Sequence, residues 1–127
     1  MSDIPDTTIA YIAGLFDGEG CVTWKNTEHV FITNCYPHHL LEIKNLFRCG
    51  RVVCHSTRRE KQRTSYRLSF FGQNARNFVT KIRPYLREKG YQVDIMMSIR
   101  SCPKASKLRE TLITELKDLK RIDYGPA

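Results

Sequence analysis

The chain has 127 residues, enough to enclose one hydrophobic core but too few for two domains. Lys and Arg number 21 against 13 Asp and Glu, which gives a formal net charge of +8 and a pI near 9.4. A field of this sign attracts polyanions. The sequence contains no long apolar run and no leader-like segment. We therefore expect a single basic domain spanning residues 1–127 that is neither secreted nor inserted in a membrane.

The first predicted element is a helix at about residues 6–20. Its core-facing side is indicated by apolar residues at the spacing i, i+3, i+4 and i+7, namely Ile9, Ile12, Ala13 and Phe16. A second stripe, Ala10, Gly14 and Gly18, repeats every four residues and consists of small residues. Such a stripe lowers helix propensity but allows another helix to approach very closely. We expect a second protein helix to pack there.

The helix ends with a carboxylate, Glu19, between Gly18 and Gly20. Many helices end in an acid followed by glycine only because glycine forms the cap. However, the partial negative charge at a helix C-terminus disfavours a carboxylate. Glu19 is therefore a candidate functional acid.

Strand and helix patterns then alternate along the chain. Strands are predicted at 21–26 and 29–35 around a turn at Asn26-Thr27, followed by a helix at 40–47 and strands at 51–57 and 63–71. A helix is predicted from residue 72 to about 86, and Pro84 should end or bend it. Two further helices are predicted at 91–100 and 107–122, so the C-terminal helices occupy about 90–122. In the last helix Leu108, Leu112, Leu116 and Leu119 share one side. The order αββαββα, followed by C-terminal helices, predicts an α+β fold with an antiparallel sheet.

One face of the predicted sheet carries cations and hydrogen-bonding groups. Its strand positions include Lys25, His29, Thr33, Arg51, His55, Arg63, Ser65 and Arg67, without an acid, and the loop at 58–62 adds Arg58, Arg59 and Lys61 against Glu60. An ordinary solvated face is the alternative, but such faces usually mix both signs of charge. Arginine can read guanine edges, and loop cations can contact phosphates. This face is therefore a predicted nucleic-acid surface.

The five cysteines are odd in number and lack the paired spacing of a zinc ribbon. A reduced, intracellular setting suits them. Two irregular groups could form a metal site on paper: Cys35 with His38 and His39, and Cys49 with Cys54 and His55. The favoured interpretation is that the cysteines are small, half-buried side chains.

Residues 12–20, IAGLFDGEG, resemble the signature motif of the LAGLIDADG homing endonucleases. The motif is present once, and single-motif members of that family are homodimers. The resemblance implies the αββαββα fold with a saddle-shaped four-stranded antiparallel sheet. It also implies two motif helices that pack along a two-fold axis through Ala10, Ala13, Gly14 and Asp17. Asp17 is further expected to hydrogen-bond backbone near the motif turn.

The implied activity is site-specific cleavage of double-stranded DNA at a long pseudo-palindromic site, leaving 3′ overhangs. Two Glu19 carboxylates near a two-fold axis would repel each other unless a cation lay between them. Oxygen ligands of this kind suit Mg²⁺. The predicted metal ligands are Glu19 and Gly18, with Mn²⁺ able to substitute and Ca²⁺ expected to bind without supporting cleavage.

The family pattern assigns catalytic roles to two further residues, Asn34 and Lys89. Asn34 stands where the family often has a Gln that orders water, and Lys89 stands where a family lysine stabilises charge near the scissile bond. The predicted partners are double-stranded DNA and a second copy of the chain, at the DNA of a bacterium, phage or organelle. The alternative is a non-cleaving binder of the same fold, either a DNA-binding regulator or a maturase that binds intron RNA. Retention of Glu19 and Lys89 favours cleavage.

Overall fold

The computed structural model describes residues 4–56 and 64–120. Its elements, in chain order, are α1 (Asp6–Glu19), β1 (Gly20–Trp24), β2 (Glu28–Asn34), α2 (Pro37–Phe47), β3 (Arg51–Ser56), β4 (Ser65–Phe71), α3 (Gly72–Ile82), the 3₁₀ turn η1 (Arg83–Tyr85), α4 (Gly90–Ser101) and α5 (Lys107–Lys120). The predicted order αββαββα with two C-terminal helices is confirmed. Within the described residues, no helix is both long and apolar enough to cross a bilayer.

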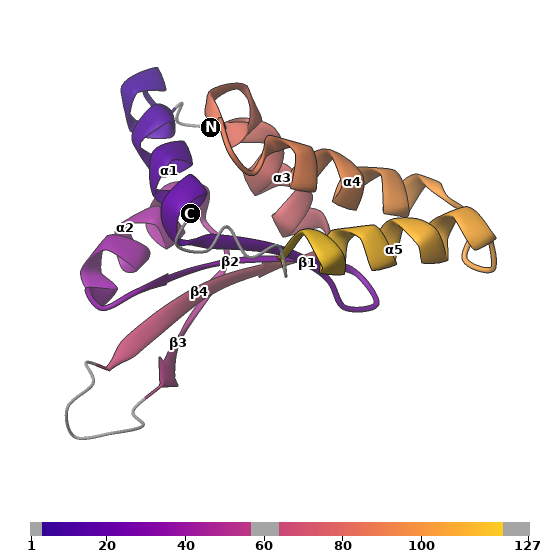
Figure 1. The fold of residues 1–127 in the computed structure, drawn as a ribbon. Helices are drawn as coiled ribbons and strands as arrows, with labels where there is room; N and C mark the ends of the chain where they lie inside the picture. The colour runs from indigo at the N-terminus through magenta and orange to yellow at the C-terminus, as the bar shows by residue number, and fades with distance from the viewer. Residues whose placement is uncertain (1–3, 57–63, 121–127) are drawn as a thin grey trace, which may run out of the picture.

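The four strands form one antiparallel sheet in the order β1-β2-β4-β3. The central pair is aligned so that His29 lies opposite Phe71 and Thr33 lies opposite Arg67. Figure 1 shows a strongly twisted sheet with α1, α3 and α4 on one side, while no helix of the described residues lies over the other side. The sheet therefore has one covered face and one open face.

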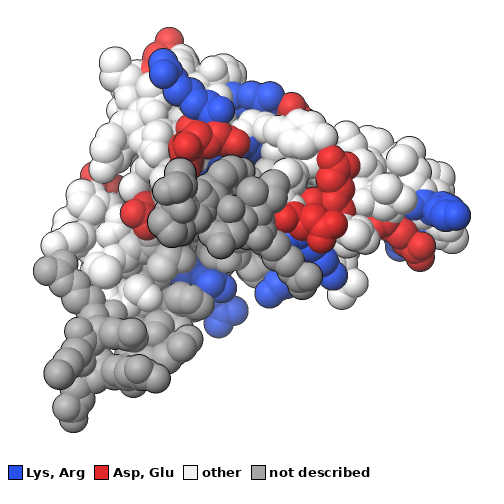
Figure 2. Space-filling view, viewed as in Figure 1, with Lys and Arg blue, Asp and Glu red and all other residues white. Residues whose placement is uncertain are grey.

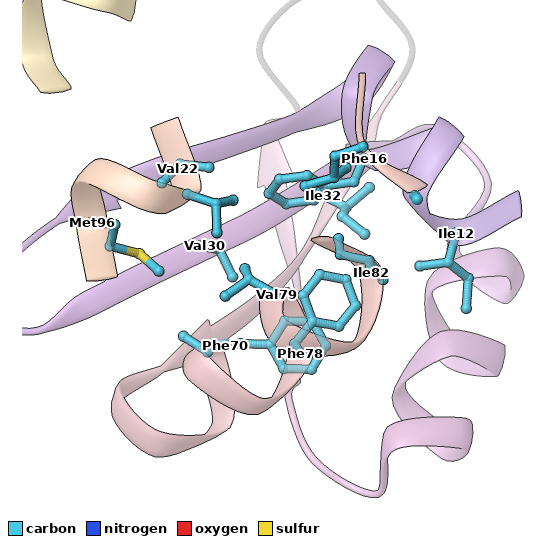
Figure 3. Close-up of a cluster of buried hydrophobic side chains, with 14 of the residues drawn as sticks. Ile12, Phe16, Val22, Val30, Ile32, Phe70, Phe78, Val79, Ile82 and Met96 are labelled. Carbon is cyan, nitrogen blue, oxygen red and sulfur yellow. The ribbon is translucent and has the colours of Figure 1, made fainter. Parts of the chain in front are cut away.

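The hydrophobic core lies between the covered face and the helices (Figure 3). Phe16 of α1, Phe70 of β4 and Phe78 of α3 are almost fully buried, and their rings contact one another through Phe78. Ile12 and Phe16 anchor the inner side of α1 in this core, as predicted from their spacing. Their burial fixes the rotation of α1 about its own axis and hence the direction of its outer stripe.

Several element boundaries differ from the sequence-based expectation. Helix α2 begins three residues earlier, because Pro37 occupies the first turn, where a missing N–H costs nothing. Helix α3 ends at Ile82, and Pro84 lies in η1 rather than in a continuing helix. Leu108 was predicted to share the apolar side of the last helix, but it is 61% exposed, while Leu116 is buried. The first turn of α5 therefore extends beyond the core.

Glu28 is a buried carboxylate that the sequence analysis did not single out. Its side chain is fully buried at the start of β2. Arg76 of α3 donates to it at 2.9 Å, Thr27 donates at 2.9 Å, and Arg100 of α4 lies 3.7 Å away. Burial alone would raise the pKa of Glu28, but the hydrogen bonds, chiefly from Arg76, hold the pKa below its ordinary value. This carboxylate joins the β1–β2 hairpin to two helices.

We predict that Glu28→Gln lowers the free energy of unfolding by about 1.5–3 kcal/mol, the size of a hydrogen bond to a charged group. Because the folded pKa is lowered, this stabilisation is present above the ordinary pKa of 4.5 and is lost as the pH falls through the folded value. Urea titrations between pH 3 and 7 measure both effects. Glu42→Gln, at an exposed position of α2, is the matched control. Equal stability and equal acid sensitivity in the two variants would contradict the prediction.

Candidate functional site

Glu19 lies at a direct junction between a helix and a strand. It is the last residue of α1, and Gly20 is the first residue of β1. A Cβ atom at Gly20 would come within 2.5 Å of the carbonyl oxygen of Phe16, so only glycine fits this junction. Glu19 is exposed, and within the described part of the chain it has no hydrogen bond or ion pair. The junction thus presents an uncompensated carboxylate at a position fixed by the core.

Lys89 comes to the same end of α1. It is half-buried at the N-cap of α4, and its Nζ donates a hydrogen bond to the carbonyl oxygen of Asp17. That carbonyl is two residues before Glu19 and belongs to the last helical turn, where carbonyl groups lack intrahelical partners. The structure therefore brings Lys89 to the helix end that carries Glu19, although the two residues are far apart in sequence.

Asp17 holds the segment that carries Lys89. Its carboxylate accepts backbone hydrogen bonds from Arg87 at 2.8 Å, Glu88 at 3.1 Å and Lys89 at 3.0 Å. The expected bonding of Asp17 to backbone is confirmed, but the partner segment lies some 70 residues along the chain. This contact could not be predicted from residue spacing, because it joins two segments far apart in the sequence.

Asn34, the third predicted catalytic residue, ends β2. Ile32, two residues earlier, pairs with Gly20, so Asn34 lies at the end of the sheet where α1 joins β1. The side-chain oxygen accepts a hydrogen bond from the backbone N–H of Tyr36 at 2.9 Å. In this arrangement Asn34 shapes the turn into α2.

One protomer offers few ligands for a metal ion. Glu19 supplies an exposed carboxylate, and Gly18 adds a carbonyl in the last turn of α1, where carbonyl groups lack intrahelical partners. Within residues 4–56 and 64–120 no group of three or more His, Cys, Asp or Glu side chains could hold a metal. All five cysteines are free thiols. The oxygen donors at the junction fit Mg²⁺ only if further ligands come from a second copy, from water or from phosphate.

The open face of the sheet carries both cations and aromatic rings. Arg51 is exposed, and Thr33 and Ser65 are half-buried. The guanidinium of Arg67 lies 3.7 Å from the ring centroid of Phe31, a cation–π contact between the two central strands. This contact holds the guanidinium near the middle of the face. Two exposed or half-exposed aromatics of this face, Phe31 and Phe71, were not among the predicted binding residues, although strand alternation places both on it.

The prediction that His29 faces solvent is wrong. His29 is only 4% exposed, its ring stacks on Phe71 with centroids 4.2 Å apart, and it also lies beside Ser69. Strand alternation predicted the correct face for His29, but neighbouring side chains across the strands cover its ring.

Lys25 is exposed in the turn after β1. The side chain of His55, and Arg58, Arg59, Lys61 and Arg63, lie outside the described residues.

The outer stripe of α1 has no partner within the described protomer. Gly14 and Gly18 are exposed, Ala10 is half-buried, and a Cβ added at either glycine would meet no atom within 4 Å. A groove of about 390 Å³ runs beside this stripe, lined by Ala10, Gly14, Asp17 and residues 84–87. Ala13 does not belong to the outer stripe: it is fully buried in the protomer's own core, so its predicted place at a dimer interface is wrong.

Charge is unevenly distributed over the molecule. In the view of Figure 2 acidic and basic side chains are mixed over the helices, and Lys and Arg project below the sheet. The open face carries Arg51 and Arg67 among its described strand residues, and no Asp or Glu. The chain as a whole carries a net charge of +8, and a field of this sign attracts polyanions.

Comparison with known proteins identifies the fold and the family. The family model described as a LAGLIDADG-like domain matches residues 6–83, more than half of the chain. The chain belongs to the LAGLIDADG family. No functionally curated protein sequence matches this chain.

Solved structures share the fold. The homing endonuclease I-CvuI, in complex with its target in the presence of Ca, matches with a TM-score of 0.69 and 19% identity, over 95% of this chain and 87% of that one. The archaeal intron-encoded homing endonuclease I-Vdi141I, complexed with DNA, gives a TM-score of 0.69 and 19% identity over 94% and 87%. The homing endonuclease I-TnaI gives a TM-score of 0.60 and 17% identity over 94% and 96%. The predicted LAGLIDADG endonuclease fold is confirmed.

Proposed function

We propose that this protein is a site-specific endonuclease that cuts double-stranded DNA as a homodimer. The observation that carries the proposal is the α1–β1 junction, where an exposed and unpaired Glu19 lies at the end of a helix whose outer stripe is open. The ammonium of Lys89 lies at the same helix end. An exposed carboxylate and a lysine at one helix end are the groups that a site for a cation and a phosphate needs.

The glycine stripe of α1 supports the proposed homodimer. Gly14 and Gly18 leave the backbone of α1 open over two turns, which permits close packing of a second helix. A second copy of α1, related by a two-fold axis, is the partner whose surface is self-complementary by symmetry. Such packing would bring the last turns of the two helices, and so two Glu19 carboxylates, towards each other. A two-fold dimer would read a pseudo-palindromic DNA site.

Mg²⁺ is the proposed cofactor, held by Glu19 and the carbonyl of Gly18 together with ligands from the second copy, water and DNA. When bound, a divalent ion would polarise phosphate and lower the pKa of a bound water. Glu19 would hold the ion through its charge, and Lys89 would stabilise negative charge on the phosphodiester. I-CvuI has been crystallised with DNA in the presence of Ca and of Mg, which supports the use of divalent ions in this fold. We expect Mn²⁺ to replace Mg²⁺ and Ca²⁺ to support binding alone.

The open sheet face is the proposed DNA-binding surface. Arg67, held over Phe31, would read a base edge in the major groove, while the exposed Arg51 could reach a phosphate or a base. The cations at 58–63 and Lys25 would add phosphate contacts. We further propose that cleavage leaves 3′ overhangs and that the protein acts wherever its target DNA lies inside the cell.

Glu19→Gln tests cleavage against binding alone. We predict that the variant binds target DNA in Ca²⁺ as tightly as the wild type but cuts about 10³-fold more slowly in Mg²⁺, because a charged metal ligand contributing several kcal/mol is lost. Plasmid cleavage and gel-shift assays on the DNA flanking the gene measure both. Glu42→Gln is the control. A wild type that binds this DNA and never cuts it would indicate a non-cleaving regulator, and preference for intron RNA would indicate a maturase.

Gly14→Gln tests the dimer. Because a side chain at Gly14 meets open space in the protomer, the fold should keep or gain up to about 1 kcal/mol of stability from better helix propensity. The same side chain would block a second helix. Sedimentation should show the wild type at twice the 14.8 kDa of one chain and the variant at 14.8 kDa. Asn45→Gln, at an exposed position of α2, should stay dimeric. A wild-type monomer, or a dimeric Gly14→Gln variant, would contradict this interface.

Arg67→Lys tests base reading by the open face. Lysine keeps the charge but loses the planar fork and its stacking on Phe31, so specific binding should weaken by about 1–3 kcal/mol while non-specific binding stays the same. Binding to the target and to scrambled DNA at one salt concentration gives the two constants. Lys104→Gln, in the loop between α4 and α5, should change neither markedly. Equal loss on both DNAs in Arg67→Lys would assign Arg67 to the phosphates instead.

A further inference from the structure

Three backbone N–H groups in a row point at one carboxylate. Asp17 Oδ2 accepts from Arg87, and Asp17 Oδ1 accepts from both Glu88 and Lys89. These bonds connect the last turn of α1 to the segment that precedes α4. In return, the Nζ of Lys89 binds the backbone carbonyl of Asp17 itself. The side chain of each residue therefore binds the backbone of the other.

The segment so held is short and fixed at both ends. Leu86, on the N-terminal side, is buried in the core. On the C-terminal side the carbonyl of Lys89 accepts from the N–H of Val93 at 3.0 Å, the first turn of α4, and Val93 is buried as well. Between these anchors the three N–H groups have Asp17 as their acceptor. Removal of that acceptor would break the three backbone hydrogen bonds from 87–89 to α1 and leave only the bond from the Lys89 Nζ among those described.

We propose that Asp17 is a positioning residue for Lys89. Its carboxylate fixes the backbone at 87–89, and the fixed backbone places the Lys89 ammonium at the C-terminal end of α1, two residues from Glu19. The inference rests on the proposed endonuclease function, in which Lys89 acts on the phosphodiester. Asp17 itself contacts neither DNA nor metal in this proposal. Its carboxylate is occupied by protein N–H groups, in contrast to the unpaired carboxylate of Glu19.

Asp17 also lies beside the outer stripe of α1. It lines the same groove as Ala10 and Gly14, opposite residues 84–87. A second copy of α1 packed on the stripe would therefore cover the contact between Asp17 and the 87–89 segment. Exclusion of water there would strengthen the hydrogen bonds. Assembly and placement of Lys89 would then be linked through one side chain.

The test separates positioning of Lys89 from general stability. Single-turnover cleavage in Mg²⁺ and DNA affinity in Ca²⁺ are measured for the wild type, Asp17→Asn, Lys89→Ala and the double variant. Asp17→Asn should cut about 10- to 100-fold more slowly, the effect of a displacement near 1 Å, with DNA affinity within about twofold of the wild type. The double variant should cut no more slowly than Lys89→Ala, because Asp17 acts through Lys89.

Two further variants keep the test decisive. Asp6→Asn removes an acid at the opposite end of α1 and should leave the rate unchanged. Asp17→Glu keeps the charge but moves the acceptor oxygens by one methylene, so it should slow cleavage as Asp17→Asn does. If thermal melting shows that Asp17→Asn is unfolded, Asp17→Glu replaces it in the test. Retention of the wild-type rate in Asp17→Glu would overturn the inference by showing that charge alone matters.

Failure of this inference differs from failure of the proposed function. If the wild type cuts DNA and the losses from Asp17→Asn and Lys89→Ala multiply, Asp17 does not act through Lys89, and the inference alone is overturned. If the wild type cuts no DNA in Mg²⁺ or Mn²⁺, the endonuclease function is overturned and the inference with it.

Discussion

The direct passage from α1 into β1 is the constraint on which the rest of the site depends. No loop separates Glu19 from Gly20, and the carbonyl and ring of Phe16 leave no room for a side chain at Gly20. Because Phe16 is fully buried, the junction is tied to the core. The acid at the end of α1 therefore has a position determined by core packing rather than by a mobile segment. A site that needs accurate placement of a charged group benefits from such support.

The two sides of α1 obey different requirements. Its inner side fills the core with Ile12 and Phe16, which contribute stability through burial. Its outer side carries glycines at two helical positions, each costing about 1 kcal/mol relative to alanine in an isolated helix. Nothing in the described protomer touches the positions where their side chains would be. The proposed partner helix would explain this cost, because it needs the space that the glycines leave, and for this reason the dimer and the active site are proposed together.

Sequence patterns predicted the order of elements, the antiparallel sheet and the two faces of α1, since these follow from periodicity and glycine placement. They did not predict contacts that depend on how distant segments meet. His29 was assigned to the correct face, but its burial depends on Phe71 across the strands. Ala13 satisfied the core pattern, whereas its place at a dimer interface was implied only by the family resemblance, and its burial decides for the core. The bonds of Asp17 to residues 87–89 and of Glu28 to Arg76 join remote segments and have no local signal.

Glu19 and Glu28, at opposite ends of the β1–β2 region, have carboxylates in very different environments. Glu28 is buried, and Arg76 compensates its charge, as is expected for an acid that serves the fold. Glu19 is exposed, and no cation of residues 4–56 and 64–120 pairs with it, although Lys89 reaches the same helix end. The ammonium of Lys89 binds the carbonyl of Asp17 instead of the carboxylate of Glu19. An acid needed only for stability would gain from an ion pair with this lysine. The structure instead keeps the carboxylate and the ammonium apart at one helix end, which supports the proposed activity, in which one binds a cation and the other a phosphate.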